Sequence, residues 1–324
     1  MKAILFRKYG GPEVLQLVET HKGGTEDGKL LVKVRAASLN AMDWHLMRGS
    51  PFLARLMGGL LRPKDPRVGV DFSGTVESVG KGVTEFHPGD DVFGGAFGSC
   101  GEYVSVEPKG IVPKPPSLSH ELAASVPLAS ITAIQALRDR GQLRPGERVL
   151  INGAGGGVGT FAVQIAKALG AHVTAATTPE NAAMVRSIGA DEVIDYTHED
   201  FTRGGERFDL IVDTAPRRSI SAYKRALRPG GRCVIVGWGG MFRLLAFVVR
   251  GKLTRKTANK KLGMFIAKRS KEDLLAVREL VLEGKVVPVL DRRFNLSEVP
   301  QAMEYLETER ARGKIVITVS TNPD

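Results

Sequence analysis

A glycine-rich run, GAGGGVG at 153–159, restricts the fold of this chain more than any other feature of its 324 residues. The run directly follows Arg148–Asn152 (RVLIN), an apolar segment typical of a buried strand. It precedes 160–169, where apolar residues recur with helical periodicity. A strand that turns through glycines into a helix is the context of a dinucleotide-binding fingerprint. A tight turn without a ligand is the alternative interpretation.

Positions 154, 156 and 159 carry the spacing of that fingerprint, with alanine in place of the first glycine. Gly156 is the residue over which a pyrophosphate passes, and Gly159 lets the helix lie close to the strand. The N–H groups that open the helix, together with its dipole, favour phosphate groups at this point. We therefore predict that the cofactor phosphates are bound by Ala154, Gly155, Gly156, Gly157 and Val158.

The end of the next expected strand indicates which dinucleotide binds. A site for NAD places a carboxylate there, about 20 residues further on, to bind the ribose 2′-hydroxyl. This chain has Thr177 and Thr178 at that point and no carboxylate before Glu180. The two threonines and Asn181 are candidate donors to a 2′-phosphate, which an acid would repel. The pattern therefore favours NADP(H), although the threonines would also suit a role as caps of the next helix.

Apolar segments of strand length alternate with helical segments in the second part of the chain. The expected strands are 148–152, 171–176, 192–194, 208–212 and 232–236. Strands separated by helices predict a parallel, doubly wound sheet with right-handed crossovers. Roughly the first 115 residues instead combine strand-like alternation with turn signals, which predicts an antiparallel, barrel-like domain. The apolar segment 314–319 is expected to return to that domain.

The basic excess of the chain is local. Lys and Arg number 46 against 35 Asp and Glu, a net charge of +11, and ten of the basic residues lie in 241–271, which has no acid. We expect this segment, with its apolar run at 244–249, to cover a pocket or to contact anionic membranes. It lacks Tyr and Trp, so nucleic-acid binding is not expected. No apolar run has the length of a membrane span and the N-terminus does not resemble a signal peptide, so we expect a cytoplasmic location.

Six further segments follow one another along the chain: SLNAMDWHLMRG at 38–49, GVDFSGTVESVG at 69–80, HPGDDVFG at 87–94, LASITAIQAL at 128–137, GADEVIDY at 189–196 and RGKIVI at 312–317. With the glycine-rich run, the ordered set resembles zinc-independent quinone oxidoreductase-like members of the medium-chain dehydrogenase/reductase superfamily, over nearly the whole chain. The resemblance implies an α/β fold with a GroES-like, mostly-β barrel domain made by 1–118 and 270–324. It also implies a Rossmann NADP-binding domain, a doubly wound parallel sheet, at 119–269, with the active site in the cleft.

The same resemblance implies roles for single residues. Thr132 would lie near the nicotinamide, Gly237 would border it, Tyr196 would lie against the adenosine, and Lys314 would reach a cofactor phosphate. Members of the family often pair the edge strands of two Rossmann sheets. Because 232–236 lies close to such an edge, we expect a homodimer.

The ligands of a catalytic zinc are missing from the positions where zinc-dependent relatives carry them. Those relatives have a cysteine near the first of the six segments, a His-Glu pair near the second, and a later cysteine. Asn40 and the triplet Gly-Val-Asp at 69–71 stand there instead, and the six histidines show no paired spacing. The two cysteines, Cys100 and Cys233, also cannot build a disulfide framework. Because zinc needs three protein ligands, usually His and Cys, we predict no metal site.

Without a Lewis acid, hydride delivery to an acceptor that is already polarised remains feasible. A quinone or an α,β-unsaturated carbonyl fits, because its conjugation spreads the arriving charge, and the apolar, basic stretch 50–66 favours a hydrophobic substrate. We predict that Asn40 hydrogen-bonds to the substrate or the cofactor amide and that His45, or water, supplies the proton. A packing role for His45 is the alternative. For the whole chain, the alternatives are an NADPH-binding regulatory or membrane-associated protein with little catalysis, and an alcohol or ketone oxidoreductase that needs a metal.

Overall fold

The computed structural model describes the chain except for residues 51, 53–54, 56–57, 206, 238–259 and 320–324. It divides into two compact units, unit 1 with 1–129, 269–275 and 288–324, and unit 2 with 130–268 and 276–287. Helices α4 (Pro127–Ile134) and α9 (Lys271–Leu282) run across the division. Unit 1 is mostly β and unit 2 holds a parallel sheet, which confirms the predicted fold class. The exact domain boundaries given above stay a prediction.

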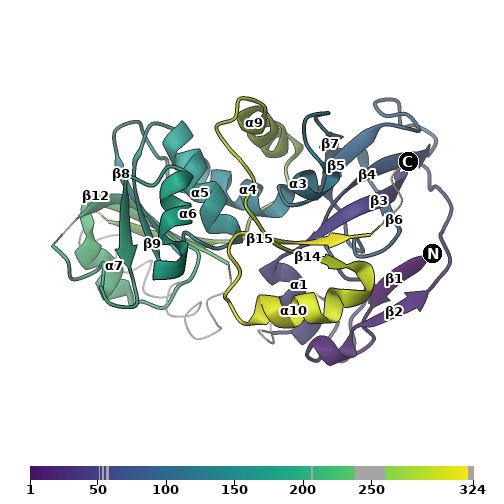
Figure 1. Cartoon of the computed structure of the whole chain (residues 1–324), viewed down its shortest axis with the longest axis horizontal. Helices are drawn as coiled ribbons and strands as arrows, with labels where there is room; N and C mark the ends of the chain where they lie inside the picture. The colour runs from purple at the N-terminus through teal and green to yellow at the C-terminus, as the bar shows by residue number, and fades with distance from the viewer. Residues whose placement is uncertain (51, 53–54, 56–57, 206, 238–259, 320–324) are drawn as a thin grey trace. The chain divides into compact units, whose positions relative to one another are not determined.

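Unit 1 is built on a seven-stranded sheet in the order β14-β15-β3-β4-β5-β7, with β6 also paired to β3. Its strands are β3 (Leu30–Leu39), β4 (Asp71–Val79), β5 (Asp91–Gly95), β6 (Tyr103–Val106), β7 (Ile111–Pro113), β14 (Leu290–Asn295) and β15 (Lys314–Thr318). Neighbouring strands are antiparallel except β14 and β15. Figure 1 shows the C-terminal β15, in yellow, beside β14 and β3, which agrees with the predicted return of this segment.

Short elements complete unit 1. They are the two-stranded pair β1 (Lys2–Leu5) and β2 (Gln16–Glu19), the helices α1 (Ala41–Arg48), α3 (His120–Ala124) and α10 (Val299–Glu307), and the 3₁₀ turns η1 (Pro12–Val14), η2 (Pro108–Gly110) and η5 (Leu296–Glu298). Helix α1 begins at Asn40, which forms a capping box with Asp43, and ends at Gly49 in the left-handed conformation. The segment predicted to carry catalytic residues is therefore a short helix with both ends capped.

The described part of unit 2 contains six parallel strands in the order β10-β9-β8-β11-β12-β13. They are β8 (Arg148–Asn152), β9 (His172–Thr177), β10 (Glu192–Asp195), β11 (Phe208–Asp213), β12 (Leu227–Val236) and β13 (Lys261–Phe265). The predicted doubly wound sheet is confirmed. The chain passes from β8 outward to β9 but from β11 outward to β12, so the direction of winding reverses between β8 and β11. Ligand sites of such sheets open at the carboxyl ends of the strands at this reversal.

The helices of unit 2 are η3 (Gln135–Arg140, a π-helical turn), η4 (Pro179–Asn181), α5 (Gly157–Ala168), α6 (Ala182–Ser187) and α7 (Ile220–Ala226). Helix α5 packs on β8 and β9, and α7 packs against β12 (Figure 1). Strand β13 was not expected from the sequence. It lies inside the basic segment 241–271 and, among the described residues, forms the sheet edge, one strand further out than the predicted strand 232–236. Its sequence, KLGMF, contains a lysine and a glycine that obscure the strand signal.

Candidate functional site

The glycine-rich loop leaves β8 through a tight turn at Gly153, whose φ is +77°. The N–H groups of Gly153 and Ala154 both donate to the carbonyl of Ala176 at the end of β9, at 3.1 and 3.2 Å. The Ala154 side chain is fully buried, so it packs into the protein interior and does not face a bound ligand. Gly156 is the N-cap of α5, and its N–H donates to the carbonyl of Gly153. The loop is thus anchored to β9 before the helix begins.

Three glycines of the loop have different surroundings. A Cβ at Gly159 would lie 2.1 Å from the carbonyl oxygen of Gly153, so the helix can pack this closely on the loop only with glycine here, as predicted. A Cβ at Gly155 would lie 2.6 Å from Nδ2 of Asn181. At Gly156, in contrast, the nearest atom is 3.5 Å away, so one face of the loop backbone is open at the residue that the fingerprint assigns to the pyrophosphate.

The residues predicted to contact the adenosine half of the cofactor gather where β9 and β10 end. Thr177 is buried, and Thr178 is the N-cap of η4, although its side chain caps no N–H there. Asn181 Nδ2 donates to Oγ1 of Thr178 at 3.4 Å, and its Oδ1 is buried without a hydrogen-bond partner among the described residues. The N–H of Tyr196 donates to the carbonyl of Thr177, and the Tyr196 side chain is 38% exposed. Unit 2 therefore brings these residues and the glycine loop together.

Thr132 and Gly237, which the resemblance places at the nicotinamide, also belong to unit 2. Thr132 is a buried residue of α4. Gly237 follows the last residue of β12 in the left-handed conformation, with φ of +80°. It thus lies at the carboxyl end of the sheet, the end at which the glycine loop leaves β8. Contacts of either residue with a nicotinamide stay predictions.

A buried polar cluster beneath the loop was missed by the sequence reasoning. Asp213, the last residue of β11, is fully buried and accepts hydrogen bonds from Asn152 Nδ2 (2.8 Å), Ala215 N (2.9 Å) and the Tyr223 hydroxyl (2.5 Å). Burial raises the pKa of Asp213, against the effect of these three hydrogen bonds. The signal for the cluster was present in the sequence, because two strands with an apolar centre each end in a polar residue, RVLIN and FDLIVD.

A second buried cluster, in unit 1, contains two of the predicted site residues. Asn40 Nδ2 donates to Asp71 Oδ2 at 3.0 Å and to the carbonyl of Ser38 at 3.3 Å. Lys314 Nζ donates to Asn40 Oδ1 at 2.5 Å and to the carbonyl of Leu39 at 3.1 Å, and it lies 3.9 Å from Asp71 Oδ2. Lys314 is only 2% exposed. The structure thus directs Lys314 toward Asn40, while its contact with a cofactor phosphate stays a prediction.

Burial controls the protonation of this cluster. It raises the pKa of Asp43, whose carboxylate accepts the Asn40 N–H, to about 7, and nearby Asp71 adds to the increase. Burial likewise raises the pKa of Asp71, against the attraction of Lys314, and it lowers the pKa of Lys314. Two carboxyl groups and one ammonium group are therefore held in a low-dielectric environment, where each disfavours its charged form unless a partner compensates.

Asp43→Asn should change how stability depends on pH. Because the pKa of Asp43 is raised from 3.8 to about 7, the folded protein holds this proton more firmly than the unfolded chain does. The resulting stabilisation is complete below about pH 4 and is lost as the pH rises through about 7. Asparagine does not titrate. Between these limits, the free energy of unfolding of the variant should therefore rise relative to that of the wild type by up to about 4 kcal/mol. Urea unfolding at about pH 5 and about pH 8 measures the gain, and an equal difference at both pH values would contradict it.

His45 lies on α1 beside Trp44, with ring centroids 4.4 Å apart. Its Nδ1 is 2.8 Å from the carbonyl oxygen of Ser50, an acceptor, so Nδ1 carries the hydrogen. Burial lowers the pKa of His45. The ring is therefore neutral at physiological pH, with its second nitrogen, Nε2, as a hydrogen-bond acceptor. The role of His45 as proton donor stays a prediction, and it requires a protonated ring that this environment disfavours.

Cysteine, histidine and carboxylate side chains do not gather in the pattern of a metal site within the described part of the chain. Cys100 and Cys233 are both buried, and burial raises the pKa of each thiol. At the first of the positions that zinc-dependent relatives use, Asn40 already binds the Lys314 ammonium. An ammonium group next to a candidate ligand atom opposes a bound cation by electrostatic repulsion.

The basic segment 241–271 is described only from residue 260 onward. Lys260 Nζ donates to the carbonyl of Lys224 at the end of α7, at 2.7 Å. Lys271 pairs with Glu85, and the Arg269 guanidinium lies over the Phe97 ring, 4.8 Å from its centroid. These three basic groups therefore contact the protein itself. The choice between pocket cover and membrane contact rests on 241–259, which lie outside the described residues, and none of the described helices is long and apolar enough to span a membrane.

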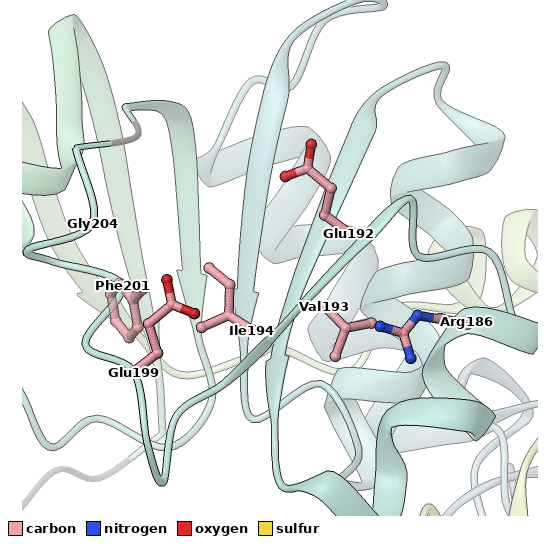
Figure 2. A pocket seen from close by; sticks show the side chains of 7 residues that line it. All are labelled: Arg186, Glu192, Val193, Ile194, Glu199, Phe201 and Gly204. Carbon is pink, nitrogen blue, oxygen red and sulfur yellow. The ribbon is translucent and has the colours of Figure 1, made fainter.

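A separate pocket of about 410 Å³ lies at the β10 edge of the unit 2 sheet (Figure 2). Figure 2 shows Val193 and Ile194 of β10 between Arg186 on one side and Glu199 with Phe201 on the other. Its lining mixes apolar groups with charges of both signs. None of the predicted cofactor-binding residues lines it, so the pocket is not the cofactor site that the sequence predicts.

Comparison with known proteins identifies both parts of the chain. Residues 26–116 match the family model of the alcohol dehydrogenase GroES-like domain, and 188–317 match that of the zinc-binding dehydrogenases. A chloroplastic quinone-oxidoreductase of Triphysaria versicolor is 34% identical, with 98% of each chain covered. A 2-methylene-furan-3-one reductase of Solanum lycopersicum is also 34% identical, over 98% of this chain and 79% of its own. The structure of Escherichia coli quinone oxidoreductase complexed with NADPH matches with a TM-score of 0.83 and 25% identity, over 98% of this chain and 100% of that one.

Proposed function

The chain belongs to the quinone oxidoreductase-like proteins of the medium-chain dehydrogenase/reductase superfamily, which use NAD(P)H, and on this basis we propose that it transfers a hydride from NADPH to a quinone or an α,β-unsaturated carbonyl without zinc. The observation that carries the proposal is the loop backbone at Gly156, where an added Cβ meets no atom closer than 3.5 Å, next to Gly155, which lies against the Asn181 side chain that donates to Thr178. The names of the relatives, a quinone-oxidoreductase and a reductase of a conjugated furanone, support the substrate class.

Two features of the residues fit a dinucleotide. Of the three loop glycines 155, 156 and 159, Gly156 alone has no described atom closer than 3.5 Å to an added Cβ. This leaves room for a phosphate over the backbone at Gly156. The buried Oδ1 of Asn181 has no partner among the described residues, and a buried amide oxygen normally has one. A ribose hydroxyl bound at Thr178 would donate to this oxygen, whereas a 2′-phosphate would accept from the Asn181 Nδ2 hydrogens. Gly157, Val158, Thr177 and Tyr196 complete the proposed cofactor-binding set with Ala154 and Gly155.

The preference for NADPH rests on the end of β9. Thr177 is followed by Thr178, and the acid nearest in sequence, Glu180, belongs to the exposed turn η4 rather than to the strand end. A carboxylate at the strand end would repel a 2′-phosphate, and hydroxyl and amide groups there do not. The bound reduced nicotinamide supplies the hydride. We propose that Thr132 and Gly237 border it.

The side chains of unit 1 would act on the acceptor. Asn40 is fixed by Lys314 on its oxygen and by Asp71 and Ser38 on its nitrogen, so any hydrogen bond to a substrate requires one of its amide hydrogens to be shared. His45 has Nε2 in the acceptor state, and we propose that it orders a water molecule, the source of the proton, at that atom. Conjugation in the acceptor lowers the need for a metal, because the arriving charge is spread over the substrate. The Lys314 ammonium beside Asn40 further supports a reaction without zinc.

NADPH binding and turnover test the proposal. We expect NADPH to raise the melting temperature of the purified protein by several degrees at about 100 times its Kd, as a ligand that binds only the folded state does. NADH should give a smaller shift at the same concentration. Some quinone or enone in a broad panel should oxidise NADPH in the presence of the protein, with no loss of activity after metal chelation. Tight NADPH binding without turnover across the panel would favour the regulatory alternative, and a loss of activity on chelation would favour the metal-dependent one.

Three further points remain proposals. We propose a homodimer, for which β13 rather than β12 offers the sheet edge, because β13 has one neighbouring strand among the described residues. Contact of 241–271 with anionic membranes stays an alternative to pocket cover. The cytoplasmic location stays a prediction, since the Triphysaria relative is chloroplastic by name.

A further inference from the structure

We propose that Asp213 is a positioning residue for the dinucleotide loop. It holds the loop through Asn152 and Thr214, and Tyr223 in turn fixes the Asp213 carboxylate. The inference rests on the proposed NADPH-binding function of the loop. It concerns residues that neither touch the open face of the loop nor form part of its glycine pattern. It assigns to the buried cluster beneath the loop a measurable effect on cofactor affinity.

The position of the cluster is the first argument. Asn152 and Asp213 are the last residues of β8 and β11, and they lie opposite each other in the register of these two strands. The two strands are the neighbours between which the winding of the sheet reverses, and the space beyond their carboxyl ends is where a doubly wound sheet binds its ligand. A polar pair at this point lies directly beneath the start of the glycine loop.

The hydrogen bonds of Asp213 are the second argument. Its carboxylate is fully buried and takes one bond from each of three segments: the end of β8, the turn after β11 and helix α7. The donors are Asn152 Nδ2, Ala215 N and the Tyr223 hydroxyl, at 2.8, 2.9 and 2.5 Å. A buried carboxylate with this many donors fixes their mutual positions, because moving any of them leaves a charge without compensation. Tyr223 is itself fully buried, so its hydroxyl cannot hydrogen-bond to solvent in place of Asp213.

The third argument is the contact of the β11 turn with the loop itself. Thr214, next to Asp213, donates its N–H and its hydroxyl to the carbonyl of Asn152, at 3.0 and 2.9 Å, and its Oγ1 lies 3.3 Å from the carbonyl of Gly153. A Cβ on Gly153 would lie 2.5 Å from that Oγ1. The β9 side holds the same loop through the carbonyl of Ala176. Gly153 is thus held from both neighbouring strands and Ala154 from β9, and Asp213 supplies the rigid side-chain part of that clamp.

Two substitutions test the clamp in the full-length protein. Asn152→Ala removes one donor to Asp213 at the loop, and Tyr223→Phe removes the hydroxyl without changing the ring. We expect the Kd for NADPH, measured by titration calorimetry, to rise about tenfold in the first and about fivefold in the second. Asp213→Asn keeps an acceptor for Asn152 and Ala215, but it leaves the hydroxyl hydrogen of the fully buried Tyr223 without its acceptor. It should therefore raise the Kd about fivefold, as Tyr223→Phe does.

Tyr305→Phe is the matched control. The Tyr305 hydroxyl also donates to a carboxylate, Asp291 Oδ2 at 2.8 Å, but it belongs to unit 1 and lies at β14 and α10. Both Tyr→Phe variants should lower the melting temperature of the cofactor-free protein, and only Tyr223→Phe should change the Kd. Wild-type Kd values in folded Asn152→Ala and Tyr223→Phe would overturn the inference, as would an equal effect of Tyr305→Phe. If Asn152→Ala does not fold, the milder Tyr223→Phe decides. Absence of NADPH and NADH binding by the wild-type protein would instead refute the proposed function, and the inference with it.

Discussion

Gly159→Ala should weaken NADPH binding by at least about tenfold and lower the free energy of unfolding by about 1–3 kcal/mol. The added Cβ would lie 2.1 Å from the carbonyl oxygen of Gly153, 2.7 Å from Cα of Ala154 and 2.8 Å from its carbonyl carbon. All three neighbours are backbone atoms, so no flexible side chain can give way. Helix α5 must therefore shift away from the loop, and the N–H groups at its start move with it. Titration calorimetry and urea unfolding measure the two effects.

Two other glycines serve as controls for this substitution. Gly156→Ala places its Cβ at an ordinary van der Waals distance, 3.5 Å from the Gly153 carbonyl oxygen, so its cofactor-free stability should stay close to that of the wild type while the pyrophosphate is hindered. Gly263→Ala, on β13, has no atom of the described residues within 4 Å of the added Cβ and should change neither property. A Gly159→Ala protein with wild-type affinity would show that the helix start does not bind the phosphates.

Lys314→Met should lower the free energy of unfolding by about 3–5 kcal/mol near neutral pH. The ammonium group is 2% exposed, donates to Asn40 and to the carbonyl of Leu39, and compensates the buried Asp71 carboxylate. Methionine fills a similar volume without a charge, so Asp71 is left buried and ionised. Protonation of Asp71 removes that charge. The deficit should therefore shrink as the pH falls from about 8 to about 5, which urea unfolding at both values measures.

A second substitution separates charge from packing in this variant. Asp71→Asn combined with Lys314→Met removes the uncompensated carboxylate and should recover part of the lost stability. Lys114→Met is the matched control, because the Lys114 side chain is also largely buried but lies 3.5 Å from Asp91, a carboxylate that is 42% exposed. Its loss should be smaller at pH 8, because the Asp91 carboxylate remains in contact with solvent. A Lys314→Met deficit that is equal at both pH values would contradict the electrostatic explanation.

The sequence predicted the inner strands of the unit 2 sheet well because they are buried on both faces and therefore appear as nearly continuous apolar runs, as in RVLIN and FDLIV. Strand β13 was not predicted because an edge strand tolerates lysine and glycine, so its sequence carries no clear strand pattern. Its pairing with β12 defines it as a strand. The glycine loop was also predictable, since its function requires a fixed spacing of residues without side chains. Local pattern and local structure coincide in both of these cases.

The unit 1 site could not be predicted from local pattern. Asn40 appeared in the sequence as a candidate donor to the substrate, yet its oxygen binds Lys314, 274 residues further along the chain. Lys314 in turn appeared as a candidate for the cofactor phosphate, and the structure buries it next to Asn40. A polar residue in a motif shows that a hydrogen bond is needed there. It does not show which distant residue provides it.

The pairing of β15 with β3 has a consequence for how the protein is made. Ala36, Ala37 and Leu39 of β3 pair with a strand that leaves the ribosome 276 to 282 residues later. Residues 130–268, which form most of unit 2, are synthesised in between. All of the described strands of the unit 2 sheet lie within this range, so they can pair as soon as it has been synthesised. The earlier part of unit 1 must wait with an unpaired, largely apolar strand edge, and such edges associate readily with other chains. Growth temperature and chaperone supply should thus affect the yield of this protein through its first 129 residues, long before any of them meets a cofactor.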